Sequence, residues 1–88
     1  MLRGGHANIG KEMVLVAVAG KIVVTTEMQD IPPQTFTLEN PHFGLYMPML
    51  CWHTMKYSHN AVQLVLASTV YDQADYIRDY NQFLNYGK

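Results

Sequence analysis

Hydrophobic and polar positions follow two different periods along the chain. Residues 13–19 form a continuous apolar run, and a second run rich in β-branched residues fills 21–28 after Gly20. Runs of this kind on either side of a glycine predict an antiparallel pair of strands. Further apolar or aromatic runs predict short strands at 34–38, 43–47, 51–57 and 61–67, the last of a buried type. Short strands at this spacing are typical of an all-β sandwich or barrel.

Two successive prolines interrupt this series of strands. Pro32 and Pro33 each lack a backbone N–H, so a central strand could not hold them without losing two hydrogen bonds of its ladder. We therefore predict an exposed turn over 29–33. The Glu-Asn-Pro segment at 39–41 predicts a second turn.

Near the C-terminus the period changes from that of strands to that of a helix. Between residues 71 and 84 the large side chains fall at intervals of one, three, three and one, which predicts an amphipathic helix. Ser68 or Asp72 could cap its start, and Gly87 suits its end. The side chains expected to dock it are Tyr76, Ile77, Tyr80 and Phe83.

The amino-acid composition bears on the oligomeric state and on the kinds of partner that the chain can bind. The chain has 88 residues, of which 49% are hydrophobic and only 15% charged. So much apolar surface on so small a domain predicts that a second subunit covers part of it, and we expect a homodimer. Six basic and seven acidic residues leave a formal charge of -1 with no basic cluster, which argues against nucleic acid and anionic membranes as partners.

The single cysteine and the hydropathy of the chain indicate its cellular compartment. Cys51 cannot form an internal disulfide and lies in an apolar run, which fits a reducing compartment and predicts a cytoplasmic protein. No apolar run approaches the roughly 20 residues that span a bilayer, and the N-terminus lacks the layout of a signal peptide.

Candidate chemistry is concentrated in the segment from Arg3 to Asn8, which reads Arg-Gly-Gly-His-Ala-Asn. Alternation along an extended backbone sends His6 and Asn8 to the same face, so a possible base lies beside a polar partner. The residues alone leave four roles open for this face: catalysis, metal binding, ligand binding, or lining the core.

This segment belongs to a pair of spacings that resembles the two cupin motifs. The first is Gly5-His6-x-Asn8-x3-Glu12-x7-Gly20, and the second runs from Gly44 through Pro48 to His53. In cupins such motifs point histidines and an acid into a small barrel, where they can meet a divalent metal. Asn8 stands where a second histidine is usual, so a metalloenzyme here would rely on His6, Glu12 and His53 alone.

The resemblance is closer to one group of small cupins, the sugar nucleotide 3,4-ketoisomerase family. It rests on Arg3-Gly-x-His-Ala, on Gly44-Leu-Tyr-x-Pro with Trp52-His53, on Val-Leu-Ala-Ser at 65–68, and on Tyr71-Asp with Asp-Tyr-Ile-Arg at 75–78. It implies an all-β cupin or jelly-roll barrel with a short C-terminal helix, homodimeric and without a metal or other cofactor. We expect one domain over 1–88 and leave open whether the natural chain begins before Met1.

The resemblance also implies a reaction and a role for each site residue. Family members move the keto group of a dTDP-4-keto-6-deoxyhexose from C4 to C3 through an enediol, in the synthesis of deoxysugars for surface polysaccharides. By resemblance His6 is the base, Arg78 packs on the nucleotide base, and Arg3 opens the motif. Asn8 would donate a hydrogen bond to the substrate oxygen, and His53 would line the pocket.

Two departures from the family pattern support an alternative function. Asn8 replaces the second histidine of the motif, and Met13 stands where the family commonly has glutamine after the acid. An amide cannot shuttle a proton at neutral pH. The alternative is a family member that binds a sugar nucleotide or carbohydrate without isomerising it.

Several of these side chains also have a purely structural interpretation. Arg3 could be a solvated terminal charge, and His53 could be a core histidine. Glu12 is expected to face water rather than act as a catalytic acid. We also expect exposed side chains at His42 and His59, a solvated helix face at Asp72, Asp75 and Asp79, and packing roles for the C-terminal aromatic residues.

Overall fold

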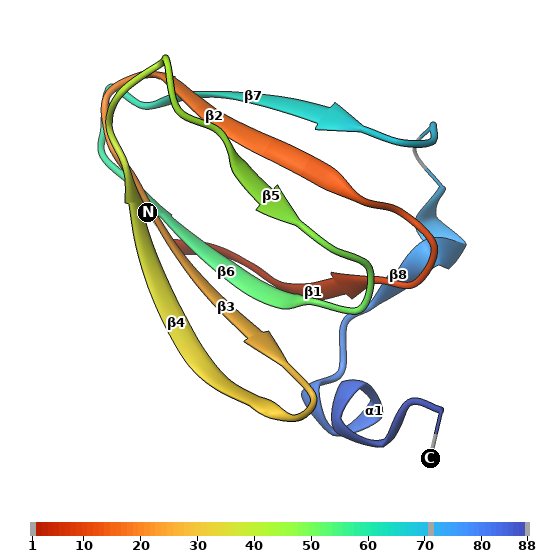
Figure 1. Cartoon of the computed structure of the whole chain (residues 1–88). Helices are drawn as coiled ribbons and strands as arrows, with labels where there is room; N and C mark the ends of the chain where they lie inside the picture. The colour runs from red at the N-terminus through yellow and green to blue at the C-terminus, as the bar shows by residue number, and fades with distance from the viewer. Residues whose placement is uncertain (1, 71, 88) are drawn as a thin grey trace.

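The computed structural model describes residues 2–70 and 72–87, with the backbone alone for 2–4 and 73. Two antiparallel sheets face each other, and a short helix lies at one end (Figure 1). One sheet has the strand order β4-β3-β6-β1-β8, and the other has the order β5-β2-β7. The strands are β1 Leu2–Asn8, β2 Met13–Ala19, β3 Ile22–Met28, β4 Ile31–Leu38, β5 Leu45–Met47, β6 Trp52–Tyr57, β7 Val62–Ala67 and β8 Tyr76–Ile77. The expectation of an all-β fold with a C-terminal helix is confirmed.

The main core lies between the two sheets. Alternate residues of β2 and β3 point inward, so that Leu15, Ile22 and Val24 are almost completely removed from solvent. The chain passes from β2 into β3 through Gly20, which has a φ of 70°. A Cβ atom there would lie 2.7 Å from the backbone of Ala61, so this turn requires a glycine.

The predicted turn over 29–33 is wrong in its extent, because β4 begins at Ile31 and includes both prolines. β4 is the edge strand of its sheet, with only β3 as a neighbour. An edge strand can accept proline because the missing N–H may face outward, away from the ladder. The register between β3 and β4 shifts between Thr26 and Met28, which absorbs the irregularity next to the prolines.

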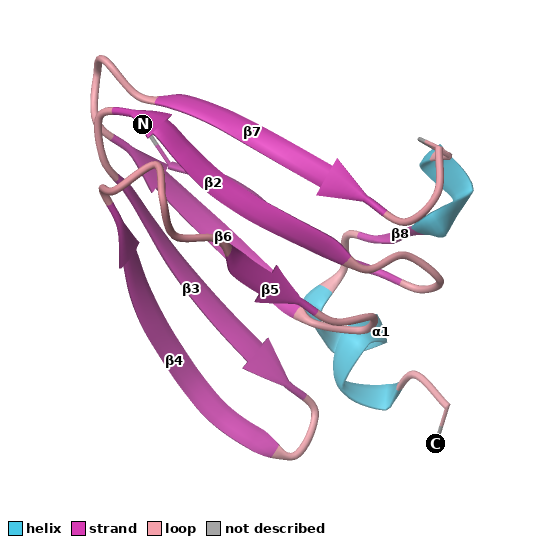
Figure 2. Ribbon diagram, turned by 45° about the horizontal axis from the view of Figure 1, so that its top comes forward, coloured by secondary structure: helices cyan, strands magenta, loops and turns pink. Residues whose placement is uncertain are grey.

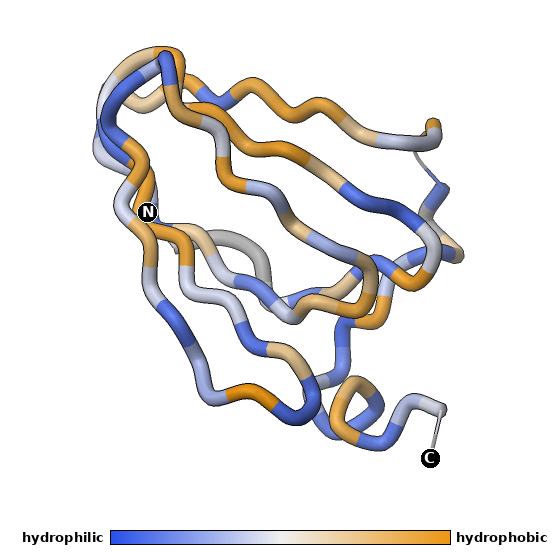
Figure 3. The backbone as a smooth tube through the Cα atoms, in the orientation of Figure 1, coloured by the Kyte–Doolittle hydropathy of each residue, from blue (hydrophilic) through white to orange (hydrophobic). Residues whose placement is uncertain are grey.

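The prediction of a buried type of strand at 61–67 is also wrong in its burial. β7 forms the edge of the three-stranded sheet, and Val62, Leu64 and Leu66 are each about half exposed (53%, 46% and 56%). Its neighbour β2 shares the same strongly apolar composition, as Figure 3 shows. The described residues therefore leave an apolar outer sheet face open to solvent.

The C-terminal helix is much shorter than the pattern predicted. Residues 73–75 form a 3₁₀ turn, Tyr76 and Ile77 form β8, and only Tyr80–Asn85 is helical (α1). The side chain of Asp79 caps α1 by accepting a hydrogen bond from the N–H of Asn81, so neither Ser68 nor Asp72 is the cap. Tyr71 lies outside the described residues, and Gly87 follows the helix closely, as expected.

Pairing with β1 explains why Tyr76 and Ile77 are not helical. Ala7 pairs with Ile77 and Asn8 with Tyr76, so β8 extends the larger sheet by one short strand. Ile77 and Phe83 are buried with Ala7 in a second, smaller core, whereas Tyr80 is 41% exposed. The helix α1 lies next to β1 and β8 (Figure 2). None of the described helices is long and apolar enough to cross a membrane.

Candidate functional site

A cavity of about 310 Å³ opens between the two sheets. Its walls come from β1, β2, β6, β7 and β8 together with the segments that follow β1 and β7. The lining side chains are His6, Lys11, Met13, Leu15, His53, Met55, Gln63, Val65, Ala67, Thr69 and Tyr76. Of the residues that the sequence singled out for catalysis or binding, His6 and His53 are therefore brought together in one place.

A bulge in β1 sets the direction of His6. Gly5 has a φ of 78°, and the register between β1 and β6 shifts between Gly4 and His6. After the bulge His6 pairs with His53, and the centroids of the two rings lie 4.4 Å apart in an edge-to-face arrangement. The bulge at Gly5 thus places one imidazole against the other.

Burial keeps both imidazoles neutral near neutral pH. The pKa of His6 falls from 6.5 to about 4, mainly because burial disfavours the charged ring, with smaller contributions from His53, Arg78 and Lys11. Burial also lowers the pKa of His53, although its Nδ1 atom lies 3.1 Å from the carbonyl oxygen of Cys51, a contact that acts in the opposite direction. A neutral His6 can accept a proton, which is the first requirement of a general base.

Asn8 points to the same interior side as His6 but lies behind the cavity wall. Its side chain is 3% exposed, and its Nδ2 atom donates toward the sulfur of Met13 at 3.7 Å. Among the described residues, its Oδ1 atom has no hydrogen-bond partner. The two residues that depart from the family pattern therefore contact each other, and of the two only Met13 lines the cavity.

Tyr76 links the cavity to two cationic side chains. Its ring centroid lies 4.8 Å from that of His6, 5.1 Å from Nζ of Lys11 and 5.0 Å from the guanidinium carbon of Arg78. Arg78 is exposed, so its planar group is available at the mouth of the site. The side chain of Arg3 lies outside the described part of the structure. The backbone of Arg3, in β1, pairs with Met55 of β6.

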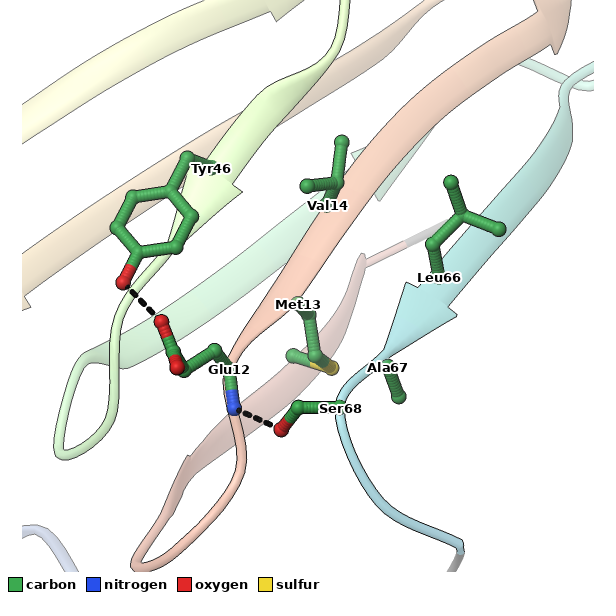
Figure 4. A pocket seen from close by; sticks show the side chains of 7 residues that line it. All are labelled: Glu12, Met13, Val14, Tyr46, Leu66, Ala67 and Ser68. Atoms are coloured by element: carbon green, nitrogen blue, oxygen red, sulfur yellow. Dashed lines mark hydrogen bonds between the residues drawn. The ribbon is translucent and has the colours of Figure 1, made fainter.

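Glu12 does not join the histidines. Figure 4 shows it in a separate hollow on the outer side of the smaller sheet, where its carboxylate accepts a hydrogen bond from the hydroxyl of Tyr46 at 2.5 Å. Its backbone N–H donates to the hydroxyl of Ser68. The three ligands that a cupin metalloenzyme would need here, His6, Glu12 and His53, are therefore not assembled. Nor do the described residues contain any other group of three histidine, cysteine or acidic side chains placed to hold a metal.

Sequence reasoning missed two residues of this site, Lys11 and Tyr76. Leu15 and Met13 are buried at alternate positions of β2, and the same alternation continued backwards reaches Lys11, which is the signal that could have found it. Tyr76 was assigned to helix packing because its spacing from Tyr80 and Phe83 is helical. The predicted exposure of His42 and His59 is confirmed.

Comparison with known proteins gives a consistent set of relatives. Residues 1–88 match the family described as FdtA: WxcM-like, C-terminal. A TDP-4-oxo-6-deoxy-α-D-glucose-3,4-oxoisomerase from Aneurinibacillus thermoaerophilus is 42% identical over 85 residues, which are 96% of this chain and 60% of that protein.

Solved structures agree with the sequence match. The TDP-quinovose 3,4-ketoisomerase WlaRB from Campylobacter jejuni is 38% identical with a TM-score of 0.90, over 96% of this chain and 65% of its own. A histidine-to-asparagine mutant of the 3,4-ketoisomerase QdtA from Thermoanaerobacterium thermosaccharolyticum, in complex with TDP-4-keto-6-deoxyglucose, is 31% identical with a TM-score of 0.91, over 97% and 62%. The chain thus spans a little under two thirds of the length of these relatives.

Proposed function

The chain belongs to the WxcM-like, C-terminal family, and from this premise we propose that it acts as a 3,4-ketoisomerase on a dTDP-linked 4-keto-6-deoxyhexose. The observation that carries the proposal is the pair of neutral imidazoles, His6 and His53, at one wall of the cavity between the sheets. The product would enter the synthesis of deoxysugars for surface polysaccharides.

His6 is the base of the proposed reaction. It removes the proton from C3, the electrons of that bond form a C3–C4 double bond, and the carbonyl electrons move to the oxygen on C4. The proton of the hydroxyl on C3 passes to the oxygen on C4, the carbonyl forms at C3, and C4 takes the proton that His6 holds, so no proton is gained or lost overall. His53, 4.4 Å from His6, lines the pocket and lies close enough to exchange a proton through the substrate or a water.

The remaining site residues bind rather than transfer protons. Arg78 packs its guanidinium on the nucleotide base, for which its exposed position next to Tyr76 is suited. Asn8 donates a hydrogen bond to a substrate oxygen once the flexible thioether of Met13 gives way. Arg3 contributes to substrate binding through its charge. No step of this scheme uses a metal or another cofactor.

The contact between Asn8 and Met13 favours a second candidate function, binding without isomerisation. Asn8 and Met13 replace the second histidine and the glutamine of the family motif. The described part of the cavity therefore has fewer groups that can relay protons than the family motif would supply. The QdtA mutant, which carries asparagine in place of a histidine, is in complex with TDP-4-keto-6-deoxyglucose. For this chain the second function is binding of the keto sugar without turnover.

We also propose an oligomeric state, a cellular location and a set of excluded partners for this chain. The apolar outer face of β2 and β7 is of the kind that a second copy covers, and we expect a homodimer. We also expect a cytoplasmic protein that binds neither nucleic acid nor membrane, with one domain over 1–88.

One experiment separates the two candidate functions. Calorimetry with dTDP and with dTDP-4-keto-6-deoxyglucose measures binding, and NMR of the same mixture follows the 3-keto product. Binding with product supports the isomerase, and binding without product supports the second function. Failure to bind either ligand would overturn both.

A further inference from the structure

We propose that Lys11 is a further substrate-contacting residue, whose ammonium group meets the sugar oxygen that becomes negatively charged when the enediol forms. This inference rests on the proposed function and deepens it. It starts from the cavity and from the burial of Lys11.

Lys11 is unusually well buried for a lysine. Only 4% of its surface is exposed, and it shares a row with the buried Met13 and Leu15 on the interior side of the smaller sheet. Lysine is almost never this deeply buried unless the ammonium has a partner, because removing the charge from water is costly. Within the cavity its Nζ atom lies 5.1 Å from the ring centroid of Tyr76, a distance at which an aromatic ring attracts a cation.

The charges around the cavity favour a negatively charged guest. None of the described residues that line it carries a carboxylate, and both lining histidines have lowered pKa values and are neutral near pH 7. Lys11 is therefore the charged member of the lining. An ammonium in such a site lowers the energy of a developing oxyanion far more than it would in water.

The positions of the cavity groups give His6 and Lys11 different roles, proton removal and stabilisation of the oxygen. Tyr76 lies between them as a common neighbour, 4.8 Å from the ring of His6 and 5.1 Å from Nζ of Lys11. A sugar ring held in this space can offer a C–H bond to His6 and an oxygen to Lys11 at the same time. As His6 takes the C3 proton, the carbonyl electrons move to the oxygen on C4, and Lys11 donates a hydrogen bond to that oxygen. The oxygen on C4 then takes the proton that the hydroxyl on C3 gives up, so its charge is neutralised while Lys11 keeps its own proton and the carbonyl forms at C3.

Lys11 also offers a physical reason why this chain could work without the usual histidine at position 8. The amide of Asn8 contacts Met13 and does not line the cavity of the free protein, whereas Lys11 does, so Lys11 brings a polar group to the cavity before Met13 moves. The change of chemistry would then be from a proton relay to a fixed positive charge beside the same oxygen.

The test replaces Lys11 by methionine, which keeps the length of the side chain and removes its charge. Lys56→Met, at an exposed position of β6, is the matched control, and Lys11→Gln is a second variant should Lys11→Met fail to fold. We expect Lys11→Met to slow deuterium incorporation at C3 of dTDP-4-keto-6-deoxyglucose by about 10²–10³-fold, the usual loss for an oxyanion donor. The control should match the wild type, and binding of dTDP alone should be unchanged in both.

A second readout does not depend on turnover. Because Lys11 helps to lower the pKa of His6, the NMR titration midpoint of His6 should rise in Lys11→Met and stay unchanged in Lys56→Met. Wild-type exchange in Lys11→Met would overturn the role of Lys11 and leave the isomerase proposal standing. A wild type that binds no sugar nucleotide would overturn both. If the wild type binds the keto sugar without exchange, weaker binding of that sugar by Lys11→Met supports the contact, and equal binding overturns it.

Discussion

Two imidazoles and two cations lie near one another in this chain, and both cations help to lower the pKa of His6, a shift whose largest cause is burial. His6 lies against His53, while Lys11 and Arg78 approach the ring of Tyr76 beside it. In the free protein these neighbours and burial hold the pKa of His6 at about 4. The diphosphate of a bound nucleotide carries negative charge that opposes the effect of Arg78 on His6, so binding should raise the pKa of His6 and make it the stronger base that the reaction needs.

The first prediction concerns this pKa. In NMR titrations His6 should have a midpoint of about 4 in the free protein, and a higher midpoint when dTDP is saturating. The exposed His59 is the internal control and should not respond to dTDP. A midpoint near 6.5 without ligand would contradict the buried, neutral histidine described here.

The same shift predicts how stability depends on pH. The folded pKa of His6 lies below the unfolded value of 6.5, so between these values the unfolded chain binds more protons than the folded one. The free energy of unfolding should therefore fall as the pH falls from 6.5 toward 4. Urea denaturation at pH 7 and pH 5 measures this change. His6→Asn should lose part of the dependence, and an identical slope in the variant would argue against a contribution from His6.

At the scale of elements, the strand pattern of the sequence predicted most of the fold because alternation and β-branching act locally. The pattern failed where pairing with a strand that is distant in the sequence decides the secondary structure. Pro32 and Pro33 fit a strand because β4 is at an edge and its register with β3 shifts beside them, and Tyr76 pairs with Asn8 of β1, more than sixty residues earlier, despite its helical spacing. No local pattern carries that information.

A substitution at the N-cap of α1 tests whether the helix begins at Tyr80. Asp79→Ala removes the side-chain acceptor for the N–H of Asn81 and should lower the free energy of unfolding by about 1 kcal/mol. Asp30→Ala, at an exposed turn between β3 and β4, should have little effect and serves as the control. Chemical denaturation measures both, and equal stabilities of the two variants would contradict the cap.

The site itself was predictable from sequence to the extent that motifs carry it. Resemblance singled out His6, His53 and Arg78, and in the structure the two histidines line the cavity while Arg78 contacts the ring of Tyr76. The positive φ of Gly5 accounts for one of the two glycines of the motif. Lys11 was missed because it occupies an unspecified position of the first motif, and its contact with Tyr76 comes from an element distant in the sequence. Glu12 shows the reverse case, since its motif position does not bring it to the cavity.

At the scale of the whole molecule, one sheet has a face that is too apolar to remain in water. Val14 pairs with Leu66 and with Tyr46, and Val16 pairs with Leu64, so these side chains share the outer face of the smaller sheet. Tyr46, Leu64 and Leu66 are each about half exposed. A face of this kind is normally covered by a partner.

We therefore predict a dimer that depends on this face. Light scattering after gel filtration should give twice the mass of the chain for the wild type. The double variant Leu64→Lys with Leu66→Lys should give the mass of a monomer, because burying two ammonium groups would cost more than the contact gains. Val70→Lys, exposed but outside the sheet, is the control. A monomeric wild type at all concentrations would contradict the proposed dimer.

The central claim is that His6 removes a proton from C3 of a dTDP-linked 4-keto sugar. Incubation of the protein with dTDP-4-keto-6-deoxyglucose in deuterated water, followed by proton NMR, tests it most directly. We predict loss of the C3 proton signal with the wild type, and a rate lower by about 10²–10⁴-fold with His6→Asn, the usual range for losing a general base. His59→Asn should match the wild type. No exchange with the wild type, or equal exchange with His6→Asn, would contradict the account.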